Sequence, residues 1–269
     1  MGIDNFNYWS RYSLGSMPKC FLKEKEVSLQ ASPPGWPFSY KNNHLLGLWG
    51  RGKGRTFADE KLVVFLMQTQ KADIRSRIMS VSRELFTQKG FRGTTTRDIA
   101  QAAGIGLSNL YRYFSSKDEL FVCLLKPTTD EMERMLDEHH GIKGNDIERL
   151  QEDNYTEESL KEYMDLIGKH KDALKMLLFH SEGSSLENYK EYYVNKATKQ
   201  VITWFQAMKE KYPEINIEVS DFFIHLNNVW MFTLLEEILM HDLPEEETRT
   251  VLTDYIRFEV IGWKKMMKI

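Results

Sequence analysis

Cysteine is scarce in this 269-residue chain, which holds only Cys20 and Cys123. The two are far apart in the sequence and lack CxxC spacing, which argues against a disulfide-rich scaffold and against a zinc site built from cysteines. No apolar run reaches about 18 residues, so we expect no membrane-spanning helix. The first residues lack the basic-then-apolar pattern of an export signal. These absences predict a soluble, cytoplasmic protein of one or two domains.

Catalytic and cofactor-binding motifs are missing as well. The chain has no HExxH, GxSxG, Walker or dinucleotide-binding pattern. The neighbouring His139 and His140 fall on different faces of a helix, so they lack metal-ligand spacing. Acidic pairs such as Glu236-Glu237 are typical of solvated helix ends. We therefore predict a protein that is not an enzyme and has no catalytic residues, no metal site and no cofactor.

Charge is distributed unevenly along the chain. The total is -3, but residues 1–66 carry +4, residues 67–126 carry +5 and residues 127–269 carry -12. A basic segment joined to an acidic body suggests that one part meets a polyanion and the rest does not. Ordinary scatter of charge is the alternative interpretation.

Residues 1–66 differ from the rest of the chain. They hold 4 of the 7 prolines and 7 of the 16 glycines, clustered at 33–37 and 50–55, which excludes long helices there. One strand-like apolar run, residues 61–66, ends the stretch. We predict an irregular extension, with two interpretations open. It is either a disordered part of the protein, or upstream sequence that precedes a natural start at Met67.

Residues 67–126 have the pattern of a small helical domain. Ile74, Ile78, Val81 and Leu85 form one face of a helix, which Gly90 ends. Two short helices follow, with a turn at residues 104–106 between them. Thr95 and Asp98 have capping-box spacing at the start of the first short helix, and Ser116 and Glu119 have it at the start of a fourth helix.

Two short helices joined by a tight turn are typical of a unit that reads DNA in the major groove. Its polar residues suit that chemistry. Phosphate groups of DNA can be contacted by the hydroxyl groups of four residues and by the charge of one lysine: Thr95, Thr96, Tyr111, Tyr113 and Lys117. Base edges can be contacted by Ser108, Asn109 and Arg112, and a thymine methyl by Leu107. A plain helical bundle with solvated polar groups is the competing interpretation.

Three stretches make the pattern specific: LFTQKGF at 85–91, TTRDIAQAAGI at 95–105 and LYRYFSSKDELF at 110–121. Over about 50 residues they resemble the DNA-binding domain of TetR-like (tetracycline-repressor-like) transcriptional regulators. The resemblance implies an all-α homodimer with an N-terminal helix-turn-helix domain and a C-terminal domain, residues 127–269, that binds an effector and dimerises. By position, it implies groove contacts at Arg97, Leu107, Ser108, Asn109 and Arg112.

The resemblance has one departure. The family often has Ser-Lys-Gly-Thr where this chain has residues 106–109, GLSN. The usual serine cap and lysine are missing, so the third helix either starts at Gly106 or is capped by Ser108. This leaves the operator sequence open.

From residue 127 on, helical patterns dominate. Pro127 predicts a break or kink after the fourth helix. We expect a loop at 141–145 and helices at about 156–168, 171–182, 186–211, 219–241 and 245–267. The helix at 219–241 is apolar around much of its circumference, and the last helix carries six large apolar residues between 252 and 261. The resemblance implies that these two helices pair with their copies in a dimer. A monomer core that buries the same residues is the alternative.

The resemblance also implies a cavity for a small-molecule effector, which the spacing of residues does not itself show. Aromatic, histidine and methionine side chains suit a mostly apolar pocket. The candidates are Met164, His180, Trp204, Met208, His225 and Trp230. Core packing is the competing role of each.

Together these patterns predict a regulator that binds double-stranded DNA, a repressor released by its effector. A transcriptional activator of the same fold and a helical protein-interaction adaptor are the alternatives. Binding to a duplex that depends steeply on salt would distinguish a regulator from an adaptor.

Overall fold

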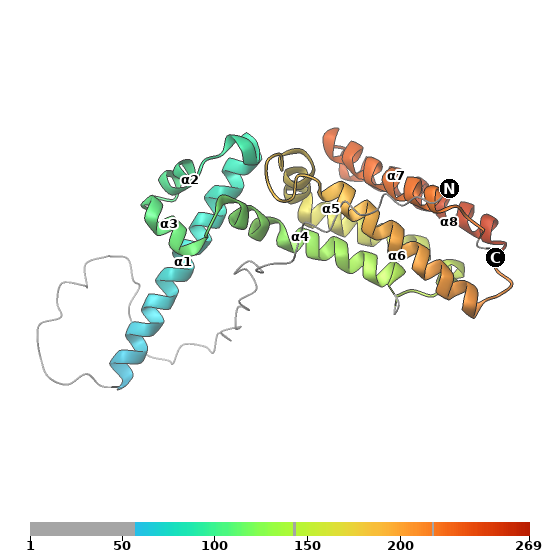
Figure 1. The fold of residues 1–269 in the computed structure, drawn as a ribbon, viewed down its shortest axis with the longest axis horizontal. Helices are drawn as coiled ribbons and strands as arrows, with labels where there is room; N and C mark the ends of the chain where they lie inside the picture. The colour runs from blue at the N-terminus through green and yellow to red at the C-terminus, as the bar shows by residue number, and fades with distance from the viewer. Residues whose placement is uncertain (1–56, 142–143, 217) are drawn as a thin grey trace, which may run out of the picture. The chain divides into compact units, whose positions relative to one another are not determined.

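The computed structural model describes residues 57–141, 144–216 and 218–269, which confirm the all-α prediction because every regular element in them is helical (Figure 1). Residues 1–56 of the predicted irregular extension lie outside the described part. The chain divides into two units, residues 1–76 and 77–269. The elements are α1 Phe57–Gly93, α2 Thr96–Ala102, α3 Leu107–Tyr113, α4 Lys117–His140, the short 3-10 helix η4 Ile147–Gln151, α5 Tyr155–Phe179, α6 Tyr189–Lys211, α7 Asp221–Met240 and α8 Glu245–Met267.

Helix α1 corrects one prediction and confirms another. The run at 61–66, predicted to be strand-like, is helical. A short apolar run does not distinguish a strand from a helix by periodicity, and here no glycine or proline interrupts the chain between residues 57 and 89. Gly90 ends the regular helix as predicted, with φ of 68°, a left-handed conformation that glycine adopts without steric cost.

Phenylalanine rings form the core where α1 meets α4. Phe86 and Phe91 stack at 5.9 Å between ring centroids, and Phe121 of α4 lies 5.0 Å from each of them. Leu110 of α3 and Phe114, which directly follows that helix, are each 2% exposed and are therefore buried as their spacing predicted. The short helices α2 and α3 pack against each other.

Helix α4 corrects the expected break at Pro127, because it continues through this proline to His140. Proline in a helix interior costs stability. Here Leu124, Leu125 and Thr128 are all buried around it, so packing holds the helix on both sides. The proposed domain border between residues 126 and 127 therefore falls inside one continuous helix.

The start of α4 follows its predicted capping box only in part. The Ser116 hydroxyl accepts a hydrogen bond from the backbone N–H of Glu119 at 2.9 Å. The Glu119 carboxylate instead accepts from Ser115, whose backbone N–H lies 2.6 Å away, and from the Ser115 hydroxyl. The reciprocal bond is thus made one residue earlier than the box requires.

Helix α5 replaces two predicted helices, because it runs unbroken through Gly168. An isolated glycine is tolerated inside a helix at a cost of about 1 kcal/mol. Helix α5 is central to the C-terminal body, since it contacts α4, α6, α7, α8 and η4. Helices α6, α7 and α8 lie within a few residues of their predicted bounds. No described helix is long and apolar enough to span a lipid bilayer.

Candidate functional site

The start of α2 is held by the predicted capping box. Asp98 N–H donates to the Thr95 hydroxyl oxygen at 3.1 Å, and Thr95 N–H donates to Asp98 Oδ2 at 2.9 Å. The Thr95 hydroxyl also donates to Asp98 Oδ2 at 2.8 Å. These bonds from Thr95 hold the pKa of Asp98 below its usual value. Both N–H and O–H protons of Thr95 are thus engaged, and a phosphate contact through its hydroxyl requires that group to turn away from Asp98.

Helix α3 separates buried from outward-facing residues as the sequence predicted. Its N-cap is Gly106, with no side-chain cap, which decides between the two predicted starts. Leu110 faces the core. The residues proposed to read bases remain accessible: Ser108 and Arg112 are exposed, and Leu107 and Asn109 are partly exposed. The outward edge of α3 is therefore polar and available to a partner.

Two predicted phosphate contacts lie together. The Thr96 hydroxyl at the start of α2 lies 3.4 Å from the Tyr111 hydroxyl on α3. The Tyr111 side chain is exposed, and Tyr113, the other proposed phenol, is partly exposed. The exposed Arg97 follows Thr96 on α2. The structure thus joins the first turn of α2 to the outward edge of α3.

Lys117 differs from a freely extended surface cation. Its ammonium donates to the backbone carbonyls of Phe91 at 2.7 Å and of Thr94 at 2.8 Å, and lies 4.0 Å from the centre of the Phe91 ring. Burial lowers the pKa of Lys117 from its usual value. An ammonium has three N–H donors, so two bonds to carbonyls leave one N–H for a phosphate. Lys117 therefore ties the start of α4 to the connection between α1 and α2.

Comparison with known families identifies this unit. Residues 78–123 match the family model described as bacterial regulatory proteins, tetR family. They form a TetR-type DNA-binding domain. The match covers the end of α1, all of α2 and α3, and the first turns of α4.

Curated relatives match over the same region. The transcriptional repressor KstR2 of Rhodococcus jostii is 37% identical over 62 residues, which are 23% of this chain and 30% of the relative. KstR2 of Mycobacterium tuberculosis is 35% identical over 77 residues, 29% of this chain and 38% of the relative. RutR of Escherichia coli is 38% identical over 56 residues, 21% of this chain and 26% of the relative. The chain thus spans well under half the length of these relatives.

Solved structures of TetR-like regulators align over more of the chain. A member of the TetR transcriptional regulator family from Streptomyces coelicolor, SCO3833, has a TM-score of 0.47 and 20% identity, covering 69% of this chain and 89% of its own. A regulator of the TerR/AcrR family from Aquifex aeolicus has a TM-score of 0.47 and 18% identity, covering 69% and 98%.

Direct contacts join the TetR-type domain to the C-terminal body. Phe91 N–H donates to the carbonyl oxygen of His180, just after α5, at 2.8 Å. Arg92 pairs with Glu182. The backbone N–H of Ser185 donates to Asp118 Oδ1 at 2.8 Å. The ends of α1 and α5 and the start of α4 are therefore connected by hydrogen bonds as well as by chain continuity.

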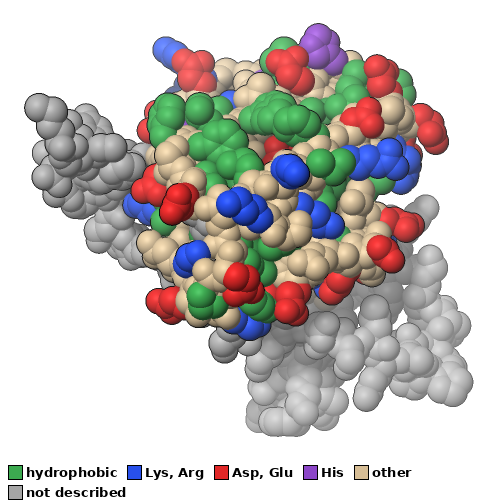
Figure 2. Space-filling model, turned by 90° about the vertical axis from the view of Figure 1, so that its right-hand side faces the viewer, with side chains coloured by type: hydrophobic (Ala, Val, Ile, Leu, Met, Phe, Trp, Pro, Cys, Tyr) green, Lys and Arg blue, Asp and Glu red, His purple; other side chains and the backbone are tan. Residues whose placement is uncertain are grey.

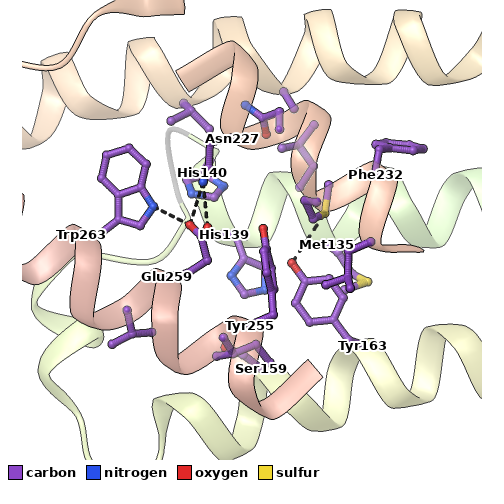
Figure 3. Close-up of a pocket in the computed structure, with 18 of the residues that line it drawn as sticks. Met135, His139, His140, Ser159, Tyr163, Asn227, Phe232, Tyr255, Glu259 and Trp263 are labelled. Atoms are coloured by element: carbon purple, nitrogen blue, oxygen red, sulfur yellow. Dashed lines mark hydrogen bonds between the residues drawn. The ribbon is translucent and has the colours of Figure 1, made fainter. Parts of the chain in front are cut away.

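The C-terminal body contains a cavity of about 220 Å³ that is partly open to its surroundings (Figure 3). Its walls come from the C-terminal half of α4, the N-terminal half of α5, and from α6, α7 and α8, with Asn145, Asp146 and Leu150 contributed by the segment that contains η4. The lining is mostly apolar and aromatic, as the resemblance implied for an effector site. Because α4 and α5 also reach the TetR-type domain at their other ends, two helices run from the cavity to the DNA-binding unit.

Glu259 on α8 is the most heavily hydrogen-bonded carboxylate of the cavity. The Asn227 amide of α7 donates to both its oxygens, at 2.9 and 2.8 Å, and the Trp263 indole N–H donates to Oε2 at 2.8 Å. Figure 3 shows these bonds around Glu259. Both donor groups are neutral, so among the described residues these three hydrogen bonds orient the carboxylate without a positively charged partner.

Other polar groups in the cavity are held in neutral form. Burial, and secondarily the neighbouring His139, lowers the pKa of His140 to about 3, so its imidazole is uncharged near neutral pH. Burial raises the pKa of Tyr163 and of Tyr255 above the usual value. The hydroxyl of Tyr163 donates to the Met231 sulfur at 3.8 Å, a weak acceptor.

His139 is engaged in a pair of its own. Its Nε2 lies 2.6 Å from Glu162 on α5, and this hydrogen bond lowers the pKa of the Glu162 carboxyl. His139 and His140, predicted to lie on different helix faces, both border the cavity, with ring centroids 6.2 Å apart. Among the described residues, no group of three or more His, Cys, Asp or Glu side chains could hold a metal ion.

Of the six predicted pocket residues, the structure brings only Trp204 to this cavity. Met164 borders a separate, more polar hollow between α5 and the start of α8. Met208 packs against the core cluster around Trp204, and His225 lies 3.5 Å from the Thr198 hydroxyl. His180 contacts the TetR-type domain, and Trp230 is 48% exposed.

Sequence reasoning missed Glu259, Asn227 and the histidine pair. Residue type alone favoured large aromatic side chains, which pack equally well in a core or at an interface. The available signal was an acidic residue between the apolar Phe258 and Val260 on the last helix. Such a carboxylate is costly to bury unless it has a structural or binding role.

Proposed function

We propose that this chain is a homodimeric repressor that binds double-stranded operator DNA and is released by a small-molecule effector. The observation that carries the proposal is the TetR-type domain at 78–123, whose α3 presents accessible polar residues beside the Thr96–Tyr111 contact. Helix α3 lies in the major groove, where Arg97, Leu107, Ser108, Asn109 and Arg112 reach the bases. Thr95, Thr96, Tyr111, Tyr113 and Lys117 contact the flanking phosphates. The protein acts in the cytoplasm, where the operator is.

Dimerisation is supported by exposed apolar side chains on the last two helices. Phe222, Leu226 and Trp230 recur every four residues along α7, and their side chains are 69%, 47% and 48% exposed. On α8, Phe258 and Ile261 are 60% and 67% exposed. Figure 2 shows hydrophobic side chains gathered in the upper part of one face of the molecule. Exposed apolar patches are typical of protein interfaces, and a second copy supplies the second DNA-reading helix that a two-fold operator needs.

The effector acts through α4 and α5 in this proposal. Ligand in the cavity contacts both helices, which end at the TetR-type domain through Lys117, His180 and their partners. A ligand shifts the equilibrium toward the released state only by its higher affinity for that state. A change in the position of α4 or α5 then alters the spacing of the two α3 helices.

Selection of bound fragments from a random DNA pool tests this function. The proposal predicts an enriched sequence with two-fold symmetry and half-sites about 34–36 Å, or a multiple of that, apart. Enrichment of no sequence would contradict sequence-specific binding. Enrichment of a single unrepeated half-site would contradict the dimer while leaving DNA recognition intact.

A further inference from the structure

The cavity wall carries carboxylates, and its His139 is hydrogen-bonded to Glu162. Among its described lining residues there is no lysine or arginine, and the two carboxylates are Asp146 and Glu259. Asp146 is paired with Lys211, which lies outside the lining. Among the described residues, the hydrogen-bond partners of Glu259 are the neutral Asn227 and Trp263. The cavity therefore offers one negative charge that no residue of its wall neutralises.

A partly buried carboxylate in apolar surroundings is costly unless an opposite charge accompanies it. The three hydrogen bonds fix the orientation of Glu259 and leave acceptor capacity, since a carboxylate has about four lone-pair sites. A ligand with a cationic N–H group can bind there and compensate the charge. An anionic ligand would meet repulsion and no cation to offset it.

The aromatic walls favour the same ligand. Tyr163, Tyr255 and Trp263 line the cavity around Glu259 (Figure 3). Aromatic faces attract cations, most strongly when both are shielded from water. Of the two histidines in the wall, His140 is neutral and does not repel a cation, and His139 is hydrogen-bonded to Glu162. The surface next to Glu259 thus suits an ammonium group rather than a carboxylate or phosphate.

Cavity size limits the rest of the ligand. An apolar cavity of about 150 Å³ binds benzene. At about 220 Å³, this cavity has room for one aromatic ring and a short chain. The methionine and leucine side chains that form much of the remaining wall suit such an apolar body.

We propose that the cavity binds small organic cations, each an ammonium group on an aromatic or apolar body, with Glu259 as the counter-ion. This proposal rests on the proposed function in one respect: the bound cation is the effector only if the protein is a regulator that a small molecule releases from DNA. The ligand class follows from the cavity itself, and binding can be measured without DNA.

A charge series of matched ligands tests the proposal. Phenylpropylamine, phenylpropanol and phenylpropionate share one ring and one chain length and differ in the charge of the terminal group. Titration calorimetry with the full-length protein near neutral pH should show the amine binding about tenfold or more tightly than the alcohol, as a charged hydrogen bond provides, and the carboxylate binding most weakly. Equal binding of the three, preference for the carboxylate, or no binding of the amine up to millimolar concentration would overturn the proposal.

Glu259→Gln separates charge from shape, because glutamine can still accept hydrogen bonds from Asn227 and Trp263. This variant should lose the preference for the amine and bind the amine and the alcohol with similar affinity. Glu236→Gln is the matched control, since Glu236 is a carboxylate on α7 that pairs with Lys190 outside the cavity. It should keep the amine preference. An unchanged preference in Glu259→Gln would contradict the role of Glu259.

A parallel DNA-binding measurement distinguishes the two proposals. If the protein binds the amine but no duplex, the proposed ligand class is supported and the proposed function as a DNA-binding regulator is contradicted. If the protein binds a duplex but does not prefer the amine over the alcohol and the carboxylate, the proposed ligand class is contradicted and the proposed regulator function is not.

Discussion

The hydroxyl oxygens of Thr96 and Tyr111 lie 3.4 Å apart, although the two residues belong to different helices. The contact places the first turn of α2 beside the outward edge of α3. Two groups proposed to hold the phosphate backbone are therefore adjacent. A DNA strand that passes this point can be contacted by both at once.

Tyr111→Phe should weaken DNA binding by about twofold to tenfold, the usual worth of one neutral hydrogen bond. The loss should be similar for all duplex sequences, because phosphate contacts carry no sequence information. Fluorescence anisotropy with labelled duplexes measures the effect. Tyr192→Phe, at an exposed tyrosine of α6, is the control and should bind like the wild type. If Tyr111→Phe binds DNA with the affinity of the wild type, the proposed phosphate contact of the Tyr111 hydroxyl is contradicted.

Asn109→Ala should instead change the preference among sequences. An asparagine that contacts a base edge discriminates against the wrong base by about 1–3 kcal/mol. The affinity for the selected operator should fall toward that for a single-base variant at the contacted position. Competition binding with a panel of operator variants measures this. An equal loss for every variant would place Asn109 at the phosphates instead.

Lys117→Ala should have two separable effects. Binding should weaken for all sequences, and the slope of log affinity against log salt should flatten by about one unit. The variant should also unfold more easily by about 1–3 kcal/mol, because the partly buried carbonyls of Phe91 and Thr94 lose their charged donor. Urea denaturation and salt titration measure the two.

Lys126→Ala provides the stability control for this experiment, since it removes an ion pair with the exposed Asp130. Its effect on unfolding should stay below about 1 kcal/mol. An unaltered salt slope in Lys117→Ala would show that Lys117 serves the fold alone.

The sequence predicted the TetR-type domain nearly residue by residue, because its determinants are local. Thr95 and Asp98 form a cap within one turn, Gly90 stops a helix, and the spacing of Leu110 and Phe114 defines a buried face. The same local logic failed at Pro127 and Gly168, where packing against neighbouring helices keeps α4 and α5 continuous. Local signals cannot report that tertiary support.

The cavity was predicted less well, because its residues come from five α-helices and from the segment that contains η4. Met164, Met208, His225 and Trp230 were chosen by residue type, and their positions depend on which face of each helix meets which neighbour. Glu259 could be identified as a cavity residue only from the packed structure, in which Asn227 and Trp263 donate hydrogen bonds to it. A site assembled from distant segments requires the packed structure.

Ile261→Glu should separate the proposed dimer. Ile261 is 67% exposed, so a carboxylate there should not disturb the folded protomer but should oppose burial against a second copy. Sedimentation velocity should show a shift from dimer to monomer, with a large loss of operator affinity. Ala207→Glu adds the same charge at an exposed position of α6 and should remain dimeric. A dimeric Ile261→Glu protein would move the interface away from this face.

Acid should destabilise the protein before its carboxylates titrate. His140 has a pKa of about 3 in the folded state against 6.5 for an ordinary histidine. Between these two pH values the unfolded chain therefore binds a proton at His140 and the folded chain does not. The contribution of neutral His140 to the free energy of unfolding should be fully present above pH 6.5. It should decline as the pH falls toward 3, with a slope of up to about 1.4 kcal/mol per pH unit.

Urea denaturation between about pH 6.5 and pH 5 measures this slope, because depressed carboxyl groups such as Glu162 act only at lower pH. His140→Gln should have a shallower slope in the same range. An identical slope in the two proteins would show that His140 is not the group that titrates.

The salt dependence of duplex binding tests the central claim most directly. Anisotropy with the selected operator and a scrambled duplex, over a range of salt concentrations, measures it. If α3 occupies the major groove between phosphate contacts, log affinity should fall linearly with log salt, by about 0.9 per phosphate neutralised, and the operator should bind more tightly than the scrambled duplex. Absence of binding to any duplex at low ionic strength, or affinity that does not change with salt, would contradict the account.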